Sequence, residues 1–303
     1  MSTAIIVKNL RKFYGRIRAV DGLSLTVPKG SVFGLVGPNG AGKTTTLGIL
    51  GGAIRANSGS VNLLDQGPFD PIKHKGRITF LPQDIKIVGH TVVYDFLMYL
   101  SILQGLSKAQ AKKSVDAMLD WVNLKDRASR PIRTLSHGMM RRLNIAQAFL
   151  GTPDIVLMDE PVSGLDPKQL VHIRYLMKSL KGKQTVVISS HILSEIEAVC
   201  DYVAFIDNGK TIREDTLNGI IRQNNRITYR LSSPGVSKEK IVASLPQCHL
   251  EERKNTLIIQ FPDSMYHPQD VNKIVLNLLI EQNIGILEVV MGSRLEQEYM
   301  QQI

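Results

Sequence analysis

The nine residues GPNGAGKTT, at positions 37–45, constrain this chain more than any other stretch. They follow the apolar run SVFGLV, precede a predicted helix, and match the pattern G-x-x-x-x-G-K-[ST] at Gly37, Gly42, Lys43 and Thr44. Glycines let backbone N–H groups wrap a phosphate, Lys43 supplies a mobile cation, and the Thr44 hydroxyl can ligate Mg²⁺. This context predicts an α/β P-loop core that binds a nucleotide, through Gly37, Pro38, Asn39, Gly40, Ala41, Gly42, Lys43, Thr44 and Thr45. The alternative is a Gly-rich turn that arose by chance.

A pair of acidic residues ends a second predicted strand. In DIVLMDEP, residues 154–161, four apolar residues indicate a buried parallel strand that leads into Asp159 and Glu160. Ligands of open α/β sheets bind beyond the carboxyl ends of the strands, so both acids are expected to face the phosphates. We expect Asp159 to hold Mg²⁺, directly or through water, and Glu160 to act as the general base that polarises an attacking water. A solvated acidic turn is the alternative.

The stretch TLSHGMMRRLNIAQAFL, residues 134–150, indicates a helix with an anion site at its positive end. Ser136 is the expected N-cap, and the free backbone N–H groups behind it favour a negatively charged ligand. The stretch nevertheless contains no Lys, no metal-binding carboxylate and no obvious base. It therefore predicts one half of a site whose other groups lie elsewhere.

Short apolar runs alternate with helical patterns over the first 215 residues. We expect strands at 4–8, 23–27, 32–36, 60–63, 78–81, 155–158, 185–189 and 202–206. Between the strands at 78–81 and 155–158 the pattern changes to helices at 91–104, 108–122 and 136–150. This change predicts a helical insertion in an α/β core.

A new unit follows a helical turn after residue 215. Its expected elements are strands at 226–231, 247–251, 255–261 and 284–291 and helices at 237–244 and 268–282. The order β-α-β-β-α-β is typical of a small ferredoxin-like α+β domain. We therefore expect a nucleotide-binding domain at 1–218, with a helical subdomain at about 88–150, and an accessory or regulatory domain at 219–303. Residues 295–300 have the spacing of an amphipathic terminal helix.

The net charge of +10 lies entirely in the first domain. Residues 220–303 hold nine basic and nine acidic side chains, so they carry no net charge. A basic domain attracts nucleotides, nucleic acid or an anionic membrane surface, and charge alone does not choose among these partners. No apolar run approaches the ~20 residues that span a bilayer, and no secretory pattern is present, so we expect a cytosolic chain. Cys200 and Cys248 lack metal-ligand spacing and fit two thiols in a reducing compartment.

With these elements in place, residues 4 to about 215 resemble the nucleotide-binding subunit of ATP-binding cassette (ABC) transporters. LSHGM, at 135–139, occupies the place of the LSGGQ signature of that family, with Ser136 and Gly138 retained and His137 and Met139 as departures. The resemblance further implies a Q-loop at Gln83 in FLPQD, a D-loop at 163–166 in SGLD, a switch histidine at His191 in SSH, and an adenine-stacking ring at Tyr14 in KFYG.

This resemblance implies a complete reaction site. Its cofactors are ATP and Mg²⁺, with Thr44, Gln83 and Asp159 around the metal. Such subunits act as head-to-tail pairs, either homodimers or pairs with a second ABC subunit, in which the Ser136 helix start faces the phosphate loop of the other chain. Glu160 then positions and partly deprotonates water for in-line attack. Lys43, Mg²⁺ and His191 stabilise the developing charge.

A transporter interpretation requires a separate integral membrane permease, which would hold this subunit at the cytoplasmic face of the cell membrane. The lone cassette, its signature and its C-terminal extension look like the ATPase subunits of bacterial exporters with separately encoded permeases, and no nucleic-acid partner is expected. The alternative is a soluble ABC ATPase that acts on ribosomes or nucleic acid. A third class, a non-hydrolysing regulatory cassette, is disfavoured by Glu160 and His191. The cargo is left open, and His137 either adds pH dependence or fills surface space.

Overall fold

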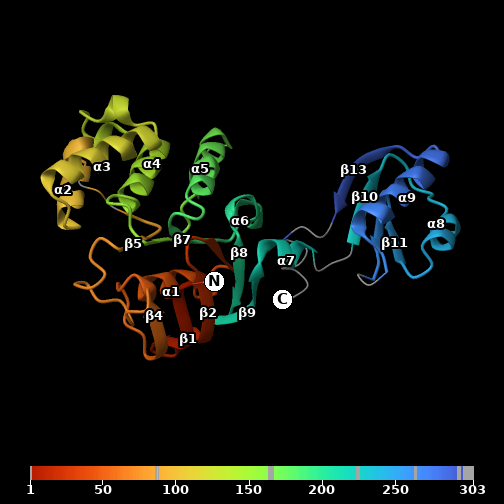
Figure 1. Cartoon of the computed structure of the whole chain (residues 1–303), viewed down its shortest axis with the longest axis horizontal. Helices are drawn as coiled ribbons and strands as arrows, with labels where there is room; N and C mark the ends of the chain where they lie inside the picture. The colour runs from red at the N-terminus through yellow and green to blue at the C-terminus, as the bar shows by residue number, and fades with distance from the viewer. Residues whose placement is uncertain are drawn as a thin grey trace. The chain divides into compact units, whose positions relative to one another are not determined.

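The computed structural model of the 303-residue chain describes residues 2–85, 87, 89–162, 167–222, 226–262, 265–291 and 295, without the side chains of 167–169, 221 and 222. The chain divides into two compact units, Met1–Asp215 and Thr216–Ile303 (Figure 1). Each unit has its own hydrophobic core of buried side chains. Each is described by itself below.

Two sheets form the first unit. β2 (Ile17–Pro28), β1 (Thr3–Tyr14) and β4 (Ser58–Leu63) pair antiparallel in that order. The second sheet has the order β5-β6-β7-β3-β8-β9, with β5 (Ile78–Leu81), β6 (Ile155–Met158), β7 (Thr185–Ser190), β3 (Val32–Val36), β8 (Tyr202–Asp207) and β9 (Lys210–Thr216). The pairs from β5 through β8 are parallel. An antiparallel sheet therefore lies beside a mainly parallel one.

The parallel sheet brings three loops to one edge. Every residue of β3, β6 and β7 is buried, as expected for short apolar strands covered on both faces. Because these strands run parallel and β7 lies between β6 and β3, their carboxyl ends meet at the same edge. The glycine loop follows β3, the acid pair follows β6, and His191 follows β7. The topology thus assembles groups that are far apart in the sequence.

The helices of the first unit follow strands of the parallel sheet. They are α1 (Lys43–Leu50), α2 (Val93–Leu103), α3 (Lys108–Trp121), α4 (His137–Ala148), α5 (Pro167–Ser179) and α6 (Leu193–Val199), with 3₁₀ turns at Lys125–Arg127 and Ile132–Thr134. The three helices expected between the strands at 78–81 and 155–158 are present: α2, α3 and α4 all fall between β5 and β6, and α3 packs against both of the others (Figure 1). A capping box at Ser107 and Gln110 explains why α3 begins where it does.

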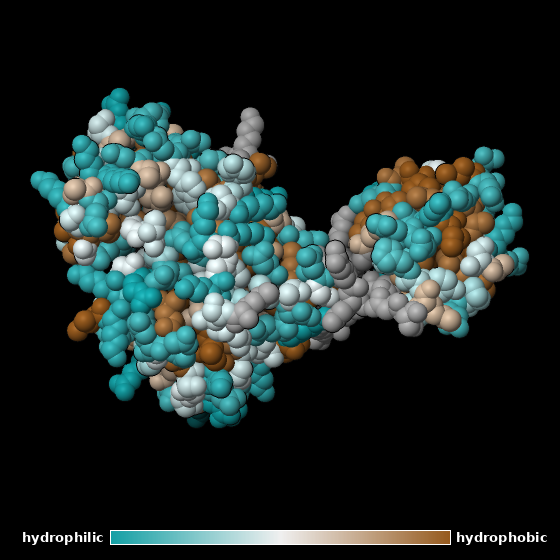
Figure 2. All heavy atoms as spheres, in the orientation of Figure 1, coloured by the Kyte–Doolittle hydropathy of each residue, from teal (hydrophilic) through white to brown (hydrophobic). Residues whose placement is uncertain are grey.

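The second unit is a four-stranded antiparallel sheet with three helices among its described residues. The strand order is β11-β12-β10-β13, from β11 (His249–Arg253), β12 (Thr256–Gln260), β10 (Arg226–Leu231) and β13 (Ile286–Met291). The helices are α7 (Leu217–Arg222), α8 (Lys238–Ser244) and α9 (Pro268–Glu281). The core lies between the sheet and α8 and α9, where Tyr229, Leu257 and Val275 are fully buried. Figure 2 also shows apolar residues on the visible face of this unit.

The sequence-based elements agree with this structure, with two differences. All eight strands expected in the first unit are present, and the strands and helices expected in the second unit are confirmed to within about two residues. β9 was missed, and β1 and β2 are each 12 residues long rather than five. The helix expected at 295–300 lies outside the described residues, except for buried Leu295. None of the helices in the described ranges is long and apolar enough to cross a membrane.

Candidate functional site

The glycine loop joins β3 to α1 and has a backbone that only glycine accommodates. Gly42, the N-cap of α1, has φ of 102°, in the left-handed region. A Cβ atom at Gly42 would collide with the carbonyl oxygen of Ala19, and one at Gly37 would collide with that of Ile206. The loop therefore runs close to neighbouring backbone and presents the N-terminus of α1, whose free N–H groups favour an anion.

Lys43, the first residue of α1, points back into the loop. Its Nζ donates to the carbonyl oxygens of Gly37 at 2.8 Å and Pro38 at 3.1 Å, and it lies 3.9 Å from Oε1 of Glu160. The side chain is 6% exposed. Burial lowers the pKa of Lys43, while the nearby Glu160 and Asp159 carboxylates oppose that shift. The ammonium thus joins the glycine loop to the acid pair.

Among the described residues, one carboxylate oxygen of Asp159 has a hydrogen-bond partner and the other has none. The residue is fully buried, and its Oδ1 accepts a hydrogen bond from the Ser189 hydroxyl at 2.5 Å. Oδ2 is buried and has no hydrogen-bond partner among the described residues. An unpaired buried carboxylate oxygen is costly unless a cation binds it. The donor chemistry therefore fits Mg²⁺, with Asp159 contributing oxygen.

The other expected metal ligands, Thr44 and Gln83, line the same cavity as Lys43. No group of three or more His, Cys, Asp or Glu side chains forms a metal site within the part of the chain that the structure describes. A bound Mg²⁺ would therefore depend on hydroxyl, amide, phosphate and water oxygens around a single carboxylate.

Glu160 has an unusual backbone conformation, with φ of 49°, which is unfavourable for a residue other than glycine. Its N–H donates to Oγ of Ser189 at 2.9 Å, which helps to hold this conformation. The carboxylate is 8% exposed, and Nδ1 of His191 lies 3.0 Å from both of its oxygens. An ionised carboxylate only accepts hydrogen bonds, so the tautomer with the proton on Nδ1 makes this contact a hydrogen bond. The Glu160 side chain is thereby oriented at the cavity.

A cavity of about 420 Å³ collects most of the expected site residues. Its lining includes Tyr14, Asn39, Gly40, Gly42, Lys43, Thr44, Thr45, Gln83, Glu160 and His191, together with Ile17, Arg18 and Ala19. Tyr14 is 47% exposed, and Nζ of Lys12 lies 4.9 Å from the centre of its ring. The size is ordinary for a cofactor site, and an exposed ring at the rim is available for stacking.

Ser136 and Gly138 do not belong to that lining. Ser136 is the N-cap of α4, where its Oγ accepts from the N–H of Met139 at 3.3 Å, as the sequence predicted. Ser136 and His137 are exposed, whereas Gly138 is buried. The two half-sites expected from the sequence are thus separate places on this chain. The expected D-loop at 163–166 lies outside the described residues.

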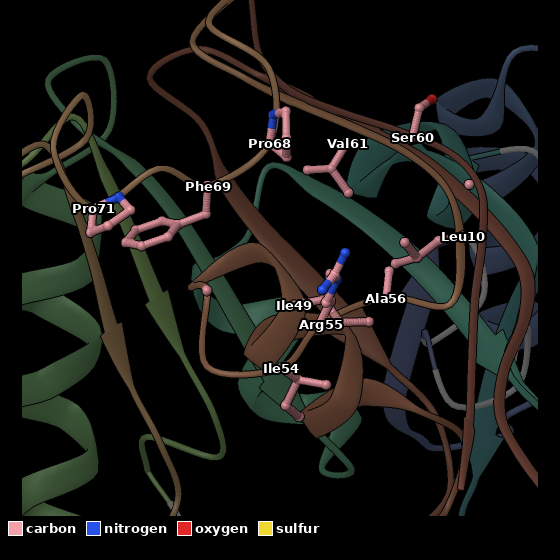
Figure 3. Close-up of a pocket in the computed structure, with 12 residues that line it drawn as sticks. Leu10, Ile49, Ile54, Arg55, Ala56, Ser60, Val61, Pro68, Phe69 and Pro71 are labelled. Atoms are coloured by element: carbon pink, nitrogen blue, oxygen red, sulfur yellow. The ribbon is translucent and has the colours of Figure 1, made fainter.

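A larger cavity, of about 640 Å³, lies in another part of the first unit (Figure 3). It is lined mainly by apolar side chains, among them Ile49, Ile54, Val61 and Phe69. Of the described residues that line this cavity, one, Arg55, carries a charge. This cavity lacks the carboxylates and the glycine loop that phosphate chemistry needs.

Ser189 is a site residue that the sequence reasoning missed. It is fully buried at the end of β7, and its single hydroxyl contacts both Asp159 and the backbone of Glu160. The available signal was a polar side chain near the carboxyl end of an otherwise apolar parallel strand, which needs a partner when buried.

Comparisons with known proteins find relatives within one family. A family model described as ABC transporter matches residues 20–163. The linearmycin resistance ATP-binding protein of Bacillus subtilis (strain 168) is 33% identical over 281 residues, covering 90% of this chain and 88% of that protein. The bacitracin transport ATP-binding protein of Bacillus licheniformis is 31% identical over 309 residues, covering 99% and 96%.

A solved structure extends the similarity to three dimensions. A dimeric ATP-binding cassette in a post-hydrolysis state, bound to ADP and Pi, superposes with a TM-score of 0.64 at 25% identity. The match covers 70% of this chain and 98% of that cassette. The similarity is thus to a whole cassette rather than to a fragment of one.

Proposed function

This chain belongs to the ATP-binding subunits of ABC transporters and is an ATPase, and we propose that Lys43, Glu160 and His191 carry out its hydrolysis. The observation that carries the proposal is their convergence on one cavity: Lys43 is 3.9 Å from the Glu160 carboxylate, and His191 is 3.0 Å from it. The buried ammonium, the base and its orienting imidazole therefore act on the same phosphate.

The division of labour follows from the positions of these groups. The N-terminus of α1 and Lys43 bind the phosphates of ATP, and the exposed ring of Tyr14 stacks on its adenine ring. Glu160, held by His191, orients a water and accepts its proton as the water attacks the terminal phosphate. Asp159, Thr44 and Gln83 would hold Mg²⁺, which when bound neutralises phosphate charge. Each role lies on a residue that surrounds the cavity or on the buried Asp159 next to it.

The second half of the ATP site comes from another chain in this proposal. Ser136 and Gly138 lie at the start of α4 and outside the lining of the cavity, and we assign both to the γ-phosphate of an ATP held by a partner. Ser136 is exposed in this chain, whereas Gly138 is buried. ABC cassettes form dimers, and one solved cassette dimer resembles this chain over 98% of its own length. We therefore propose a head-to-tail dimer, either of two copies or with a second ABC subunit.

We also propose that hydrolysis drives export through a separately encoded membrane permease. Relatives that support this direction are named for linearmycin resistance, bacitracin transport and Nod factor export. The subunit would then sit at the cytoplasmic face of the cell membrane, bound to the permease. The second unit, with antiparallel strand order β11-β12-β10-β13 and two helices on its core, is proposed to be a ferredoxin-like accessory domain.

Co-purification with an ATPase assay tests this function. The chain is expressed in its source cells with an affinity tag and isolated from detergent-solubilised membranes, and the matched control is Lys43→Met. We expect a multi-span membrane protein in both isolates and ATPase activity only in the first. Recovery of ribosomes or nucleic acid without a membrane protein would instead support an ABC ATPase that acts in translation or repair.

A further inference from the structure

Arg141, on the first turns of α4, holds three backbone carbonyls from two other segments. Its Nε donates to the carbonyl oxygen of Pro161 at 2.7 Å, and its Nη1 donates to that of Gln83 at 2.9 Å. Its Nη2 donates to the carbonyl oxygen of Glu160. Arg141 is 8% exposed, so these bonds are shielded from water. One guanidinium therefore joins α4 to the Q-loop at Gln83 and to the turn at Glu160 and Pro161.

A buried guanidinium is costly unless its donors are satisfied. Burial lowers the pKa of Arg141, and the carboxylates of Asp84, Glu160 and Asp159 counter that effect. The planar group has a fixed fork of donors that can engage several acceptors at once, which a lysine ammonium does not reproduce. The geometry at Arg141 thus depends on arginine rather than on positive charge alone.

Within the part of the chain that the structure describes, the hydrogen bonding of α4 to these two segments depends on this side chain. Every hydrogen bond that joins α4 to residues 83–85 or 159–161, among the described residues, comes from Arg141. A cavity of about 310 Å³, lined by Gln83, His137, Met140, Arg141 and neighbours, lies between the Q-loop and α4. Because this space separates the two elements, apolar packing does not replace the arginine bonds.

The next residue supplies an internal comparison. Nη1 of Arg142 donates to the carbonyl oxygens of Val122 at 2.8 Å and Asn123 at 3.0 Å, just beyond the end of α3. Arg142 thus holds α4 within the helical insertion, whereas Arg141 holds α4 to the ATP site. The two arginines are adjacent and have the same chemistry, but they join different parts of the fold.

We propose that Arg141 is a positioning residue that couples the two ATP sites of the dimer through a single chain. The inference rests on the proposed head-to-tail arrangement. In that arrangement, the Ser136 end of α4 contacts the ATP of the partner, while Gln83 and Glu160 serve the ATP of their own chain. A helix rises about 1.5 Å per residue, so Arg141 lies only about 7.5 Å along α4 from Ser136. A displacement of α4 caused by the ATP of the partner is therefore transmitted through Arg141 to Glu160 and Gln83, which contact the ATP of their own chain.

The test compares Arg141→Met and Arg141→Lys with the matched variants Arg142→Met and Arg142→Lys in the full chain. The readouts are the Hill coefficient and kcat of ATP hydrolysis, the Kd of a fluorescent ATP analogue, and Tm. For wild type we expect a Hill coefficient above 1. For Arg141→Met we expect a value near 1 and a kcat lower by roughly tenfold, with the Kd within about twofold of wild type. Arg141→Lys should fall between the two, and both Arg142 variants should keep the wild-type Hill coefficient.

Three results would overturn the coupling role. They are a wild-type Hill coefficient of 1, an unchanged Hill coefficient in both Arg141 variants, or an equal loss of cooperativity in the Arg142 variants. If Arg141→Met does not fold, Arg141→Lys decides, because it keeps the charge and most of the aliphatic stem. Absence of any ATPase activity in the wild-type chain would contradict the proposed function itself, which is a different outcome from loss of cooperativity.

Discussion

Ser189→Ala removes one hydroxyl that serves two buried groups of the site. In the native protein, Oγ of Ser189 donates to Oδ1 of Asp159 at 2.5 Å and accepts from the N–H of Glu160 at 2.9 Å. The other oxygen of Asp159 already lacks a partner among the described residues. The variant therefore leaves a buried carboxylate without any hydrogen bond from a side chain. It also releases the N–H that holds Glu160 at φ of 49°.

The expected cost follows from these two losses. A hydrogen bond to a charged group contributes about 1.5–3 kcal/mol, and an unsatisfied buried N–H costs about 1–3 kcal/mol. Allowing for partial relaxation, we expect roughly 3 kcal/mol of destabilisation without bound nucleotide. For a domain of this size that loss lowers Tm by roughly 6–12 °C. Because Glu160 is released from its position, kcat should also fall by at least about tenfold, which corresponds to 1.4 kcal/mol.

Differential scanning fluorimetry and a steady-state ATPase assay measure these effects. Ser190→Ala is the matched control, because Ser190 is buried in the same strand and its hydroxyl, among the described residues, bonds to Glu195 and to the backbone of Ile192 rather than to the acid pair. Ser190→Ala also removes a hydrogen bond to a carboxylate and one from a backbone N–H, so we expect a comparable loss of stability but most of the wild-type kcat. Equal Tm and kcat for Ser189→Ala and wild type would refute the reasoning. Equal losses of kcat in the two variants would show that the hydroxyl of Ser189 has no special role in positioning Glu160.

Two other substitutions have definite expected outcomes. Gly42→Ala places a Cβ against the carbonyl oxygen of Ala19 at φ of 102°, so we expect it to lose ATP binding in calorimetry. Gly15→Ala is strained in the same way, at φ of 58°, but its added Cβ has no neighbour within 4 Å, so it should retain binding and isolate the effect of the collision. Burial raises the pKa of Glu195, so its ionisation in the folded protein is unfavourable once the pH exceeds the value of the unfolded chain. Glu195→Gln should therefore gain Tm over wild type as the pH rises from 4 to 8, and a difference that is independent of pH would contradict this.

The groups that follow strand ends were predictable from the sequence. Lys43, Glu160 and His191 come shortly after three buried apolar strands, and parallel pairing brings the ends of those strands together. The glycine loop was equally readable, because its left-handed φ values require glycine. These residues are predictable because local pattern and topology determine their positions.

Ser189 and Arg141 were not predictable in the same way. Ser189 acts on a residue 30 positions away, and Arg141 bonds to a carbonyl 58 positions away. A carbonyl acceptor leaves no mark in the sequence, so the partners of Arg141 depend on tertiary packing alone. β9 was missed for a related reason: KTIREDT is polar and only half-buried, and it is a strand because it pairs beside β8.

The central claim is that Glu160 is the general base of the hydrolysis reaction. ATP binding itself does not require the Glu160 carboxylate. The most direct measurement is the hydrolysis rate of Glu160→Gln at saturating Mg²⁺ and ATP, with retained nucleotide and dimer mass determined by size-exclusion chromatography with light scattering. We predict a rate lower by about 10²- to 10⁴-fold and a dimer that elutes with intact ATP. Hydrolysis at the wild-type rate, or a monomer without nucleotide, would contradict the account.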